Sequence, residues 1–182
     1  TPRQGNRHVD AALEQEIRRR LDLEEARTAP PEGFPALPPV ASGRYTDPAF
    51  HQAEVDRLFG ATWLFATHTS ELTGPGDYRV VDLPIGPVVV VRGVDGEIRA
   101  FFNSCRHRGA PVTREACGTA KLLVCQYHSW AYDTAGKLKN VPDERDFAPL
   151  DREDRALVPL RCETWDGWVF VCASADPPPL VD

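Results

Sequence analysis

The 182-residue chain contains no methionine and only five histidines. A chain without an initiating methionine is expected to be processed, trimmed or part of a longer protein. Long apolar runs are also absent, and the longest, LPIGPVVVV at Leu83–Val91, falls far short of the roughly 20 residues of a membrane-spanning helix. The N-terminus lacks the apolar segment of a signal peptide. We therefore expect no membrane association and predict a cytoplasmic protein.

The chain has fewer basic than acidic residues, with 21 Lys and Arg and 27 Asp and Glu. Its net charge is therefore -6 and its pI is near 5.4. This excludes nucleic acid as an expected partner, since phosphate binding requires a basic surface. The hydrophobic content of 42% and charged content of 26% are those of an ordinary globular protein. Cytoplasmic thiols stay reduced, so the cysteines and histidines favour a metal site over a disulfide framework.

Two helices and a proline-rich strap are predicted in the N-terminal third. Asp10–Arg27 has the apolar spacing of an amphipathic helix. Ala29–Val40 is rich in proline and is expected to form an extended strap. Asp47–Phe59 is predicted as a second short helix, in which Asp47 is the N-cap and Pro48 occupies the first turn.

The rest of the chain reads as short strands separated by Gly- and Pro-containing turns, which predicts a mainly β domain of small antiparallel sheets. The predicted strands are Thr62–Ala66, Tyr78–Leu83, Val88–Arg92, Ile98–Asn103, Leu157–Leu160 and Gly167–Ala173. We expect residues 1–44 to be a helical extension with the strap, 45–175 the β domain and 176–182 a linker or tail.

Two Cys–His pairs stand out: Cys105-x-His107, then 17 residues, then Cys125-x-x-His128. Two thiolates and two imidazoles suit a soft metal. Four unrelated core residues would not account for two such pairs on short loops. A structural zinc remains a candidate, although zinc sites usually pair cysteine with cysteine and histidine with histidine. A Rieske [2Fe–2S] centre needs two Cys on one iron and two His on the other, which loops of mixed type supply.

The two loops, NSCRHRGAPV and LVCQYHSWAYDTAGKL, resemble the Rieske loops of the α subunits of aromatic-ring-hydroxylating and related non-haem iron oxygenases. The resemblance runs from about Tyr45 to Val171 and includes WLFATHTSEL, GDYRVVDL and GWVFV. It implies a Rieske-type iron–sulfur domain with an N-terminal helical extension. By this resemblance, the inner iron is ligated by two cysteines and the outer, solvent-facing iron by two histidines, namely Cys105, Cys125, His107 and His128.

The second loop departs from the family's commonest form, which has Pro and Gly where this chain has Gln126 and Ser129. These changes leave the four expected ligands intact. Rieske proteins of respiratory complexes carry an additional disulfide-forming Cys in each loop. The corresponding positions here are Ala110 and Tyr127, which indicates the low-potential type found in oxygenases and ferredoxins.

The other cysteines and the aromatic residues have simpler expected roles. Cys117 is expected to be an ordinary free thiol. Cys162 and Cys172 are expected to be small buried residues, and three tryptophans are expected in the core: Trp63, Trp165 and Trp168. Tyr127 and Trp130 adjoin the expected ligands, where either shielding of the cluster or plain packing would account for them.

No second iron site is expected in this chain, and no catalytic residue is assigned. The mononuclear iron of an oxygenase needs two His and one carboxylate, yet no His follows His128, and His8, His51 and His68 show no paired spacing. The resemblance therefore implies an electron-transfer module. It would take electrons from a reductase or ferredoxin and pass them to a mononuclear Fe(II) in a separate domain or partner.

The alternative function is a free-standing Rieske ferredoxin. The N-terminal helix and strap favour the oxygenase, because Rieske ferredoxins are typically little more than the cluster domain. An oxygenase component would assemble as a homo- or hetero-oligomer with its catalytic partner. The substrate, and the choice between mono- and dioxygenation, depend on that catalytic part.

Overall fold

The computed structural model describes residues 10–181, and its contacts divide the chain into two units, Thr1–Ala41 and Ser42–Asp182. The strap Ala29–Val40 contains no helix or strand, as its prolines predict. The expected domain boundaries after residues 44 and 175 remain predictions. Residues 1–9 of the expected N-terminal extension, and residue 182 of the expected tail, lie outside the described part.

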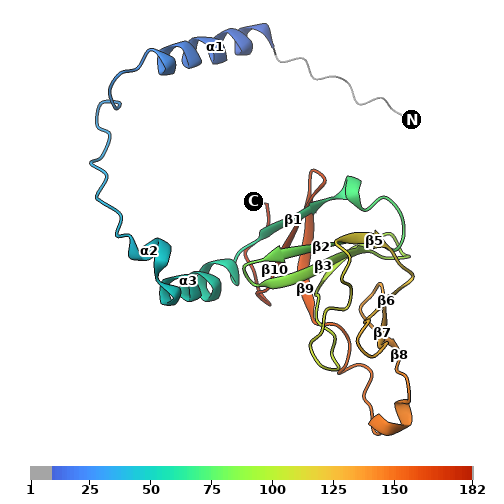
Figure 1. The fold of residues 1–182 in the computed structure, drawn as a ribbon. Coiled ribbons are helices and arrows are strands. Elements are labelled where there is room, and N and C mark those ends of the chain that lie inside the picture. The colour runs from blue at the N-terminus through green and yellow to red at the C-terminus, as the bar shows by residue number, and fades with distance from the viewer. Residues whose placement is uncertain (1–9, 182) are drawn as a thin grey trace. The chain divides into compact units, whose positions relative to one another are not determined.

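The first predicted helix is confirmed as α1, Ala11–Glu25 (Figure 1). It begins where expected, because the Asp10 carboxylate accepts a hydrogen bond from the Ala12 N–H at 3.4 Å. Along the helix, Arg18 pairs with Glu14 at 2.8 Å, one turn away. No residue of α1 is buried, so this helix contributes nothing to a core within its own unit.

The second predicted helix is present but is divided. The predicted range contains α3, Pro48–Glu54, which continues into a π-helical turn η1, Val55–Phe59. A further short helix, α2, Gly43–Thr46, precedes this range. Asp47 is the N-cap as predicted, since its carboxylate accepts from the Ala49 N–H at 2.9 Å. None of the helices in residues 10–181 is both long and apolar enough to cross a bilayer.

The body is mainly β, with two antiparallel sheets, which confirms the predicted fold class. The larger sheet curls into half a barrel in the order β1-β10-β9-β4-β3-β2-β5. Its strands are β1 Leu64–His68, β2 Asp77–Leu83, β3 Gly86–Arg92, β4 Ile98–Phe102, β5 Cys117–Thr119, β9 Pro159–Trp165 and β10 Trp168–Cys172.

A smaller sheet, in the order β6-β7-β8, lies beyond one end of the larger one (Figure 1). Its strands are β6 Leu122–Val124, β7 Ala131–Asp133 and β8 Leu138–Asn140. Two short 3-10 turns complete the body, η2 at Thr69–Glu71 and η3 at Glu144–Phe147. All six predicted strands are found with shifted ends. The four unpredicted strands, β5 to β8, have only three residues each, too few to show a period of two.

Strand β3 separates two hydrophobic cores, because its side chains alternate between the faces of the sheet. All four of Val88–Val91 are fully buried, which explains the run of valines. One face contributes Val89 and Val91 to what we call the loop core, which also includes Tyr78, Phe101, Cys105, Val112, Leu123, Cys125, Trp130, Tyr132 and Leu138. The other contributes Val88 and Val90 to the sheet core, with Ala66, Leu72, Ala100, Leu160, Val169 and Val171.

The prediction that three tryptophans lie in the core is wrong, because none of the three belongs to the sheet core or the loop core. Trp165 and Trp168 are 53% and 46% exposed, and Trp63 is half-buried. The reason is the register of the β9–β10 hairpin, whose turn at Asp166–Gly167 has positive φ at both residues. This turn places Trp165 opposite Trp168 on the outward face, and Val169 takes the inward position.

Candidate metal centre

The first Cys–His loop connects β4 to β5 and begins with a tight turn. The Cys105 N–H donates to the Ala110 carbonyl, and the Gly109 N–H donates back to the Cys105 carbonyl, both at 2.8 Å. Gly109 closes the turn with a φ of +74°, a conformation that glycine adopts without steric cost. His107 is carried at the centre of this turn.

The second loop connects β6 to β7 and closes in the same way. The Cys125 N–H donates to the Trp130 carbonyl at 2.9 Å, and the Ser129 N–H donates to the Cys125 carbonyl at 2.8 Å. Ser129 has a φ of +60°, at the position equivalent to Gly109. The two loops are therefore the same turn, although the histidine stands one residue further along the second.

Asn103 fastens the first loop at its base. Its side-chain oxygen accepts from the N–H groups of Val112 and Thr113 at 3.0 and 3.1 Å, and its amide donates to the Thr113 carbonyl at 2.9 Å. Asn103 is only 4% exposed. Buried polar groups with all partners in place hold a single geometry, so the ends of this loop are fixed.

The four predicted ligands come together as two pairs. Cys105 and Cys125 are buried in the loop core, whereas His107 is half-buried and His128 is exposed. The imidazole centroids are 4.7 Å apart with an interplanar angle of 71°. Burial raises the pKa of the Cys105 thiol, a hydrogen bond with Tyr132 opposes the rise, and the neighbouring Cys125 adds to it. The thiols thus lie inside and the imidazoles outside.

Within residues 10–181, no three Cys, His, Asp or Glu side chains are placed to hold one metal ion together. A structural zinc ion needs about four ligands around a single point. The separation into a thiol pair and an imidazole pair instead matches the ligand requirement of a two-iron centre.

Tyr132 lies beneath the first loop and contacts a predicted ligand directly. Its hydroxyl is 3.3 Å from the Cys105 sulfur and accepts a hydrogen bond from the Arg106 N–H at 3.0 Å. Burial, followed by the hydrogen bond with Cys105, raises the pKa of Tyr132 well above its usual range. The hydroxyl therefore keeps its proton. A Cys105 thiolate, which carries no proton, would accept a hydrogen bond from this hydroxyl.

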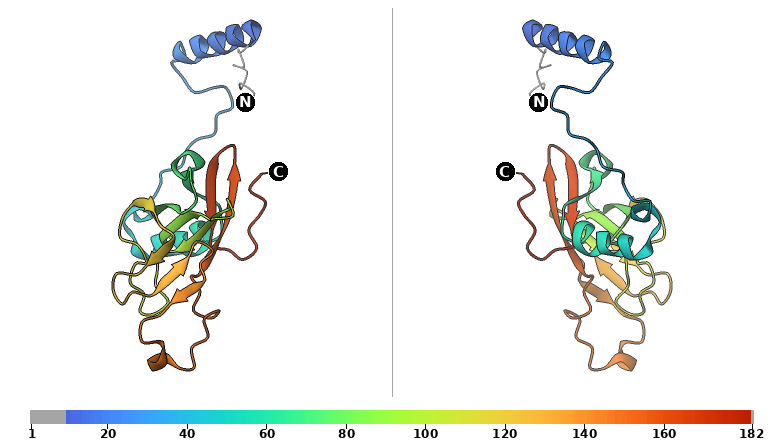
Figure 2. Two further views of the ribbon diagram at one scale, coloured as in Figure 1. Left: turned by 90° about the vertical axis from the view of Figure 1, so that its right-hand side faces the viewer. Right: turned by 90° about the vertical axis from the view of Figure 1, so that its left-hand side faces the viewer.

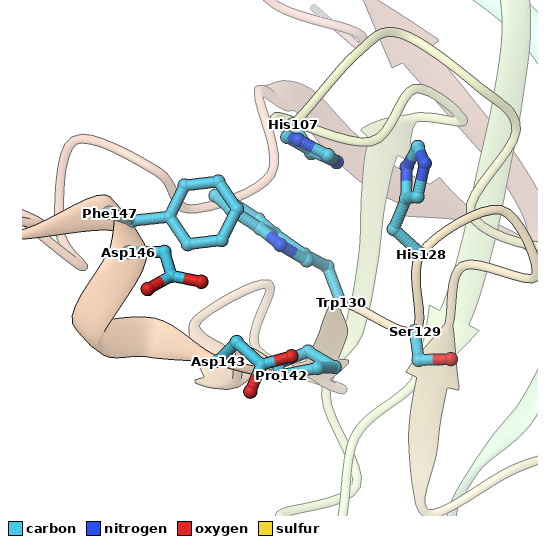
Figure 3. A pocket seen from close by; sticks show the side chains of 8 residues that line it. All are labelled: His107, His128, Ser129, Trp130, Pro142, Asp143, Asp146 and Phe147. Atoms are coloured by element: carbon cyan, nitrogen blue, oxygen red, sulfur yellow. The ribbon is translucent and has the colours of Figure 1, made fainter.

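Aromatic side chains surround the imidazoles (Figure 3). Trp130 stacks on His107, with ring centroids 4.9 Å apart and an interplanar angle of 12°. Phe147 meets His107 edge-on, with ring centroids 5.5 Å apart. Tyr127 lies against His128 with ring centroids 3.8 Å apart. Trp130 is 2% exposed and Tyr127 is 54% exposed, so Trp130 shields one side of His107 and Tyr127 remains at the surface.

Burial and nearby charge also act on the His107 imidazole. Burial lowers the pKa of His107, and the charges of His128, Arg108 and Arg155 lower it further. A cavity of about 390 Å³ opens beside both rings, lined by His107, His128, Ser129, Trp130, Pro142, Asp143, Asp146 and Phe147 (Figure 3). The outer pair is thus accessible from a surface that carries two carboxylates.

The remaining cysteines are free thiols. Cys117 is exposed and Cys172 fully buried, as expected, whereas Cys162 is half-buried. Burial raises the pKa of Cys162 to about 12.

Two of the remaining histidines have partners away from the loops. The His51 Nδ1 lies 3.6 Å from a Glu54 carboxylate oxygen, and the His68 Nδ1 is hydrogen-bonded to the Ser70 hydroxyl at 2.8 Å.

His8 lies outside the described residues. Three residues of the site were not expected from the sequence, namely Asn103, Tyr132 and Phe147. Asn103 begins the motif NSCRHRGAPV, and Tyr132 stands two residues beyond Trp130. An aromatic hydroxyl next to a ligand loop is the only signal that could have marked Tyr132. Phe147 comes from η3, which is distant in sequence from both loops.

The model of one protein family, the Rieske [2Fe-2S] domain, matches residues 62–160, which include both loops. The chain belongs to the Rieske [2Fe–2S] domain family. The resemblance to oxygenase α subunits is confirmed, as is the [2Fe–2S] cluster that the family implies.

Several curated relatives of this Rieske domain are α subunits of ring-hydroxylating dioxygenases. The chlorobenzene dioxygenase α subunit of Cupriavidus sp. (strain PS12) is 43% identical over 137 residues, covering 75% of this chain and 30% of the relative. The benzene 1,2-dioxygenase α subunit of Pseudomonas putida is 45% identical over 127 residues, covering 69% of this chain and 28% of the relative. The chain therefore spans less than a third of either relative's length.

Solved structures give the same result. A naphthalene 1,2-dioxygenase with indole bound superposes with a TM-score of 0.68 at 39% identity, covering 71% of this chain and 30% of that chain. The naphthalene 1,2-dioxygenase from Rhodococcus sp. has a TM-score of 0.71 at 29% identity and covers 95% of this chain and 38% of that chain.

Proposed function

We propose that Cys105 and Cys125 hold the inner iron of the [2Fe–2S] cluster and that His107 and His128 hold the outer iron. The observation that carries this assignment is the arrangement of the ligands as a buried thiol pair and an outward imidazole pair. Two buried thiolates would be costly without a bound cation. The donor set and its burial therefore fit the group.

We further propose that the chain is the electron-transfer module of an aromatic-ring oxygenase. When bound, the cluster supplies one-electron chemistry. Of the four proposed ligands, only the two imidazoles reach the surface, so partner proteins would exchange electrons there. Trp130 excludes water from one face of His107 by stacking on it. Once Cys105 is a thiolate it has no proton of its own, so the Tyr132 hydroxyl, 3.3 Å away, would donate a hydrogen bond to the sulfur. Both contacts hold the ligands in one geometry.

The proposed partners are a reductase or ferredoxin as donor and a catalytic part with a mononuclear iron as acceptor. The relatives are named as subunits or components of dioxygenases, some of them as parts of dioxygenase systems. A cytoplasmic location and a homo- or hetero-oligomer agree with such a system and remain part of the proposal. The free-standing ferredoxin is the second candidate. The extension with α1 and the strap favours the oxygenase.

The cluster assignment is tested on the purified 182-residue chain. We expect a red-brown protein with two irons and two acid-labile sulfides per chain. A colourless protein that binds zinc with the same four residues would refute the assignment. Substituting Ser for either Cys, or Ala for either His, should remove the visible spectrum.

The electron-transfer role is tested by turnover. The reduced chain alone should hydroxylate no aromatic substrate, and activity should appear when an oxygenase catalytic part is present. Arg108 stands beside the outer pair, with its guanidinium carbon 6.0 Å from the centre of the Tyr127 ring. Arg108→Glu should slow electron transfer while leaving the spectrum unchanged. The control is Arg114→Glu, an exposed Arg near the other end of the same loop. Equal rates in the two variants would argue against exchange at this surface.

A further inference from the structure

Four aromatic side chains form a continuous surface on the outward side of strands β1, β10 and β9, which we call the aromatic face. Its members are Phe65, Trp165, Trp168 and Phe170, of which the first three are 49%, 53% and 46% exposed. The Phe65 ring lies edge to face with Trp168 and with Phe170, at ring-centroid distances of 5.2 Å and 6.1 Å. Trp165 stands directly opposite Trp168 across the hairpin.

The aromatic face is not required for the fold of the Rieske domain itself. None of its four members belongs to the sheet core or the loop core. The family match ends at residue 160, before Trp165, Trp168 and Phe170. Aromatic side chains of this size bury about 150–250 Å² each. Four of them on one side of the sheet, three of them roughly half exposed, leave an apolar patch of the size that marks interaction sites.

The chain's own tail already covers one end of this side of the sheet. The Arg161 guanidinium donates to the Ala175 carbonyl at 2.7 Å, and the Trp63 indole donates to the Pro178 carbonyl at 2.7 Å. Cys172, paired with Arg161 in the hairpin, is fully buried. Figure 2 shows the segment after β10 turning back beside β9 and β10. The covered end is continuous with the open aromatic end.

We propose that the aromatic face is the surface on which the catalytic, mononuclear-iron part of an oxygenase α subunit packs. This inference rests on the proposed function and adds a second surface to it. More than two thirds of each relative named above lies outside the matched region. A Rieske domain that is a minor part of a larger subunit needs a permanent contact with the remainder, and clustered Trp and Phe are typical of such contacts.

The position of the aromatic face agrees with this assignment. The β9–β10 turn and the small sheet β6–β8, which carries the second Cys–His loop, lie at opposite ends of the body (Figure 1). Packing on the aromatic face would therefore leave the imidazoles free to exchange electrons. Glu163 stands opposite Phe170 on the same side, so we expect the catalytic part to place a Lys or Arg against it.

The test compares the isolated chain with a hybrid in which this chain replaces the matched region of the naphthalene 1,2-dioxygenase α subunit. Phe65→Glu and Trp168→Glu are made in both proteins. The matched control is Val94→Glu, which adds the same charge at a side chain that is 79% exposed in the β3–β4 turn. In the isolated chain, all three variants should keep the cluster spectrum and melting temperature of the unaltered chain.

In the hybrid, Phe65→Glu and Trp168→Glu should lower the yield of assembled oxygenase at least tenfold, measured by sedimentation, while Val94→Glu leaves it unchanged. Acrylamide should quench tryptophan fluorescence in the isolated chain more than in the hybrid. Equal assembly of all variants would overturn the proposal, as would failure of the unaltered hybrid to assemble. Dimerisation of the isolated chain that Trp168→Glu abolishes would assign the face to a second copy instead. Loss of the proposed function itself would show separately, as a missing cluster spectrum in the isolated chain.

Discussion

Replacing Tyr132 by Phe should lower the reduction potential of the cluster without removing it. The substitution deletes only the hydroxyl, which lies 3.3 Å from the Cys105 sulfur and accepts from the Arg106 N–H. Reduction places more negative charge on the sulfur ligands, so a hydrogen bond to sulfur stabilises the reduced state more than the oxidised state. Its loss therefore favours the oxidised state.

The size of the effect follows from the strength of the bond. A hydrogen bond to a charged group contributes about 1.5–3 kcal/mol, but it is present in both oxidation states and only the difference changes the potential. If the free energy of the hydrogen bond differs between the reduced and oxidised states by about half of its total, the difference is roughly 1 kcal/mol. For a one-electron couple about 1.4 kcal/mol corresponds to about 59 mV, so we expect a fall of roughly 30–60 mV.

The potential is measured by redox titration of the visible spectrum at one pH and ionic strength. Tyr127→Phe is the matched control, because it makes the same chemical change on an exposed tyrosine whose ring contacts His128. The control should shift the potential by much less. A Tyr132→Phe protein with an intact spectrum and an unchanged potential would refute the assigned direction of this hydrogen bond.

Three further predictions concern individual side chains. Cys105→Ser should lose both irons and lower the melting temperature, because metal-binding energy is folding energy; a variant with full iron content would contradict the ligand assignment. Ser129→Gly should raise the unfolding free energy in urea by roughly 1 kcal/mol, since a non-Gly residue at positive φ is strained; a loss of stability would show that the side chain is needed. At pH 8 a thiol reagent should modify Cys117 and spare Cys162, whose labelling should rise as the pH approaches its pKa of about 12; equally fast labelling of both would disprove the burial of Cys162.

The sequence was sufficient for the parts of the fold that depend on local chemistry. Asp10 and Asp47 cap the helices that they were predicted to begin, because a capping carboxylate acts within one turn. The central strands were found through their β-branched runs. The spacing of Cys105, His107, Cys125 and His128 identified the two loops that we propose hold the cluster, since the proposed ligands of each loop are neighbours in the chain.

Features that depend on contacts distant in sequence could not be predicted. Phe147 reaches His107 from a turn 40 residues away. Trp165 and Trp168 were assigned to the core because tryptophan is usually buried, whereas the hairpin register turns them outward. A slip of one residue would have reversed that outcome, and composition carries no information on register.

The two cores on opposite faces of β3 have a consequence for how the protein matures. The sheet core, with Val88, Val90 and Val171, contains no proposed ligand. The loop core contains both cysteines. The half-barrel can therefore pack its sheet core before the cluster is bound. Cluster binding would then add metal–ligand bonds between the two turns of the loop core. Maturation would thus proceed in two stages, with the metal-dependent stage last.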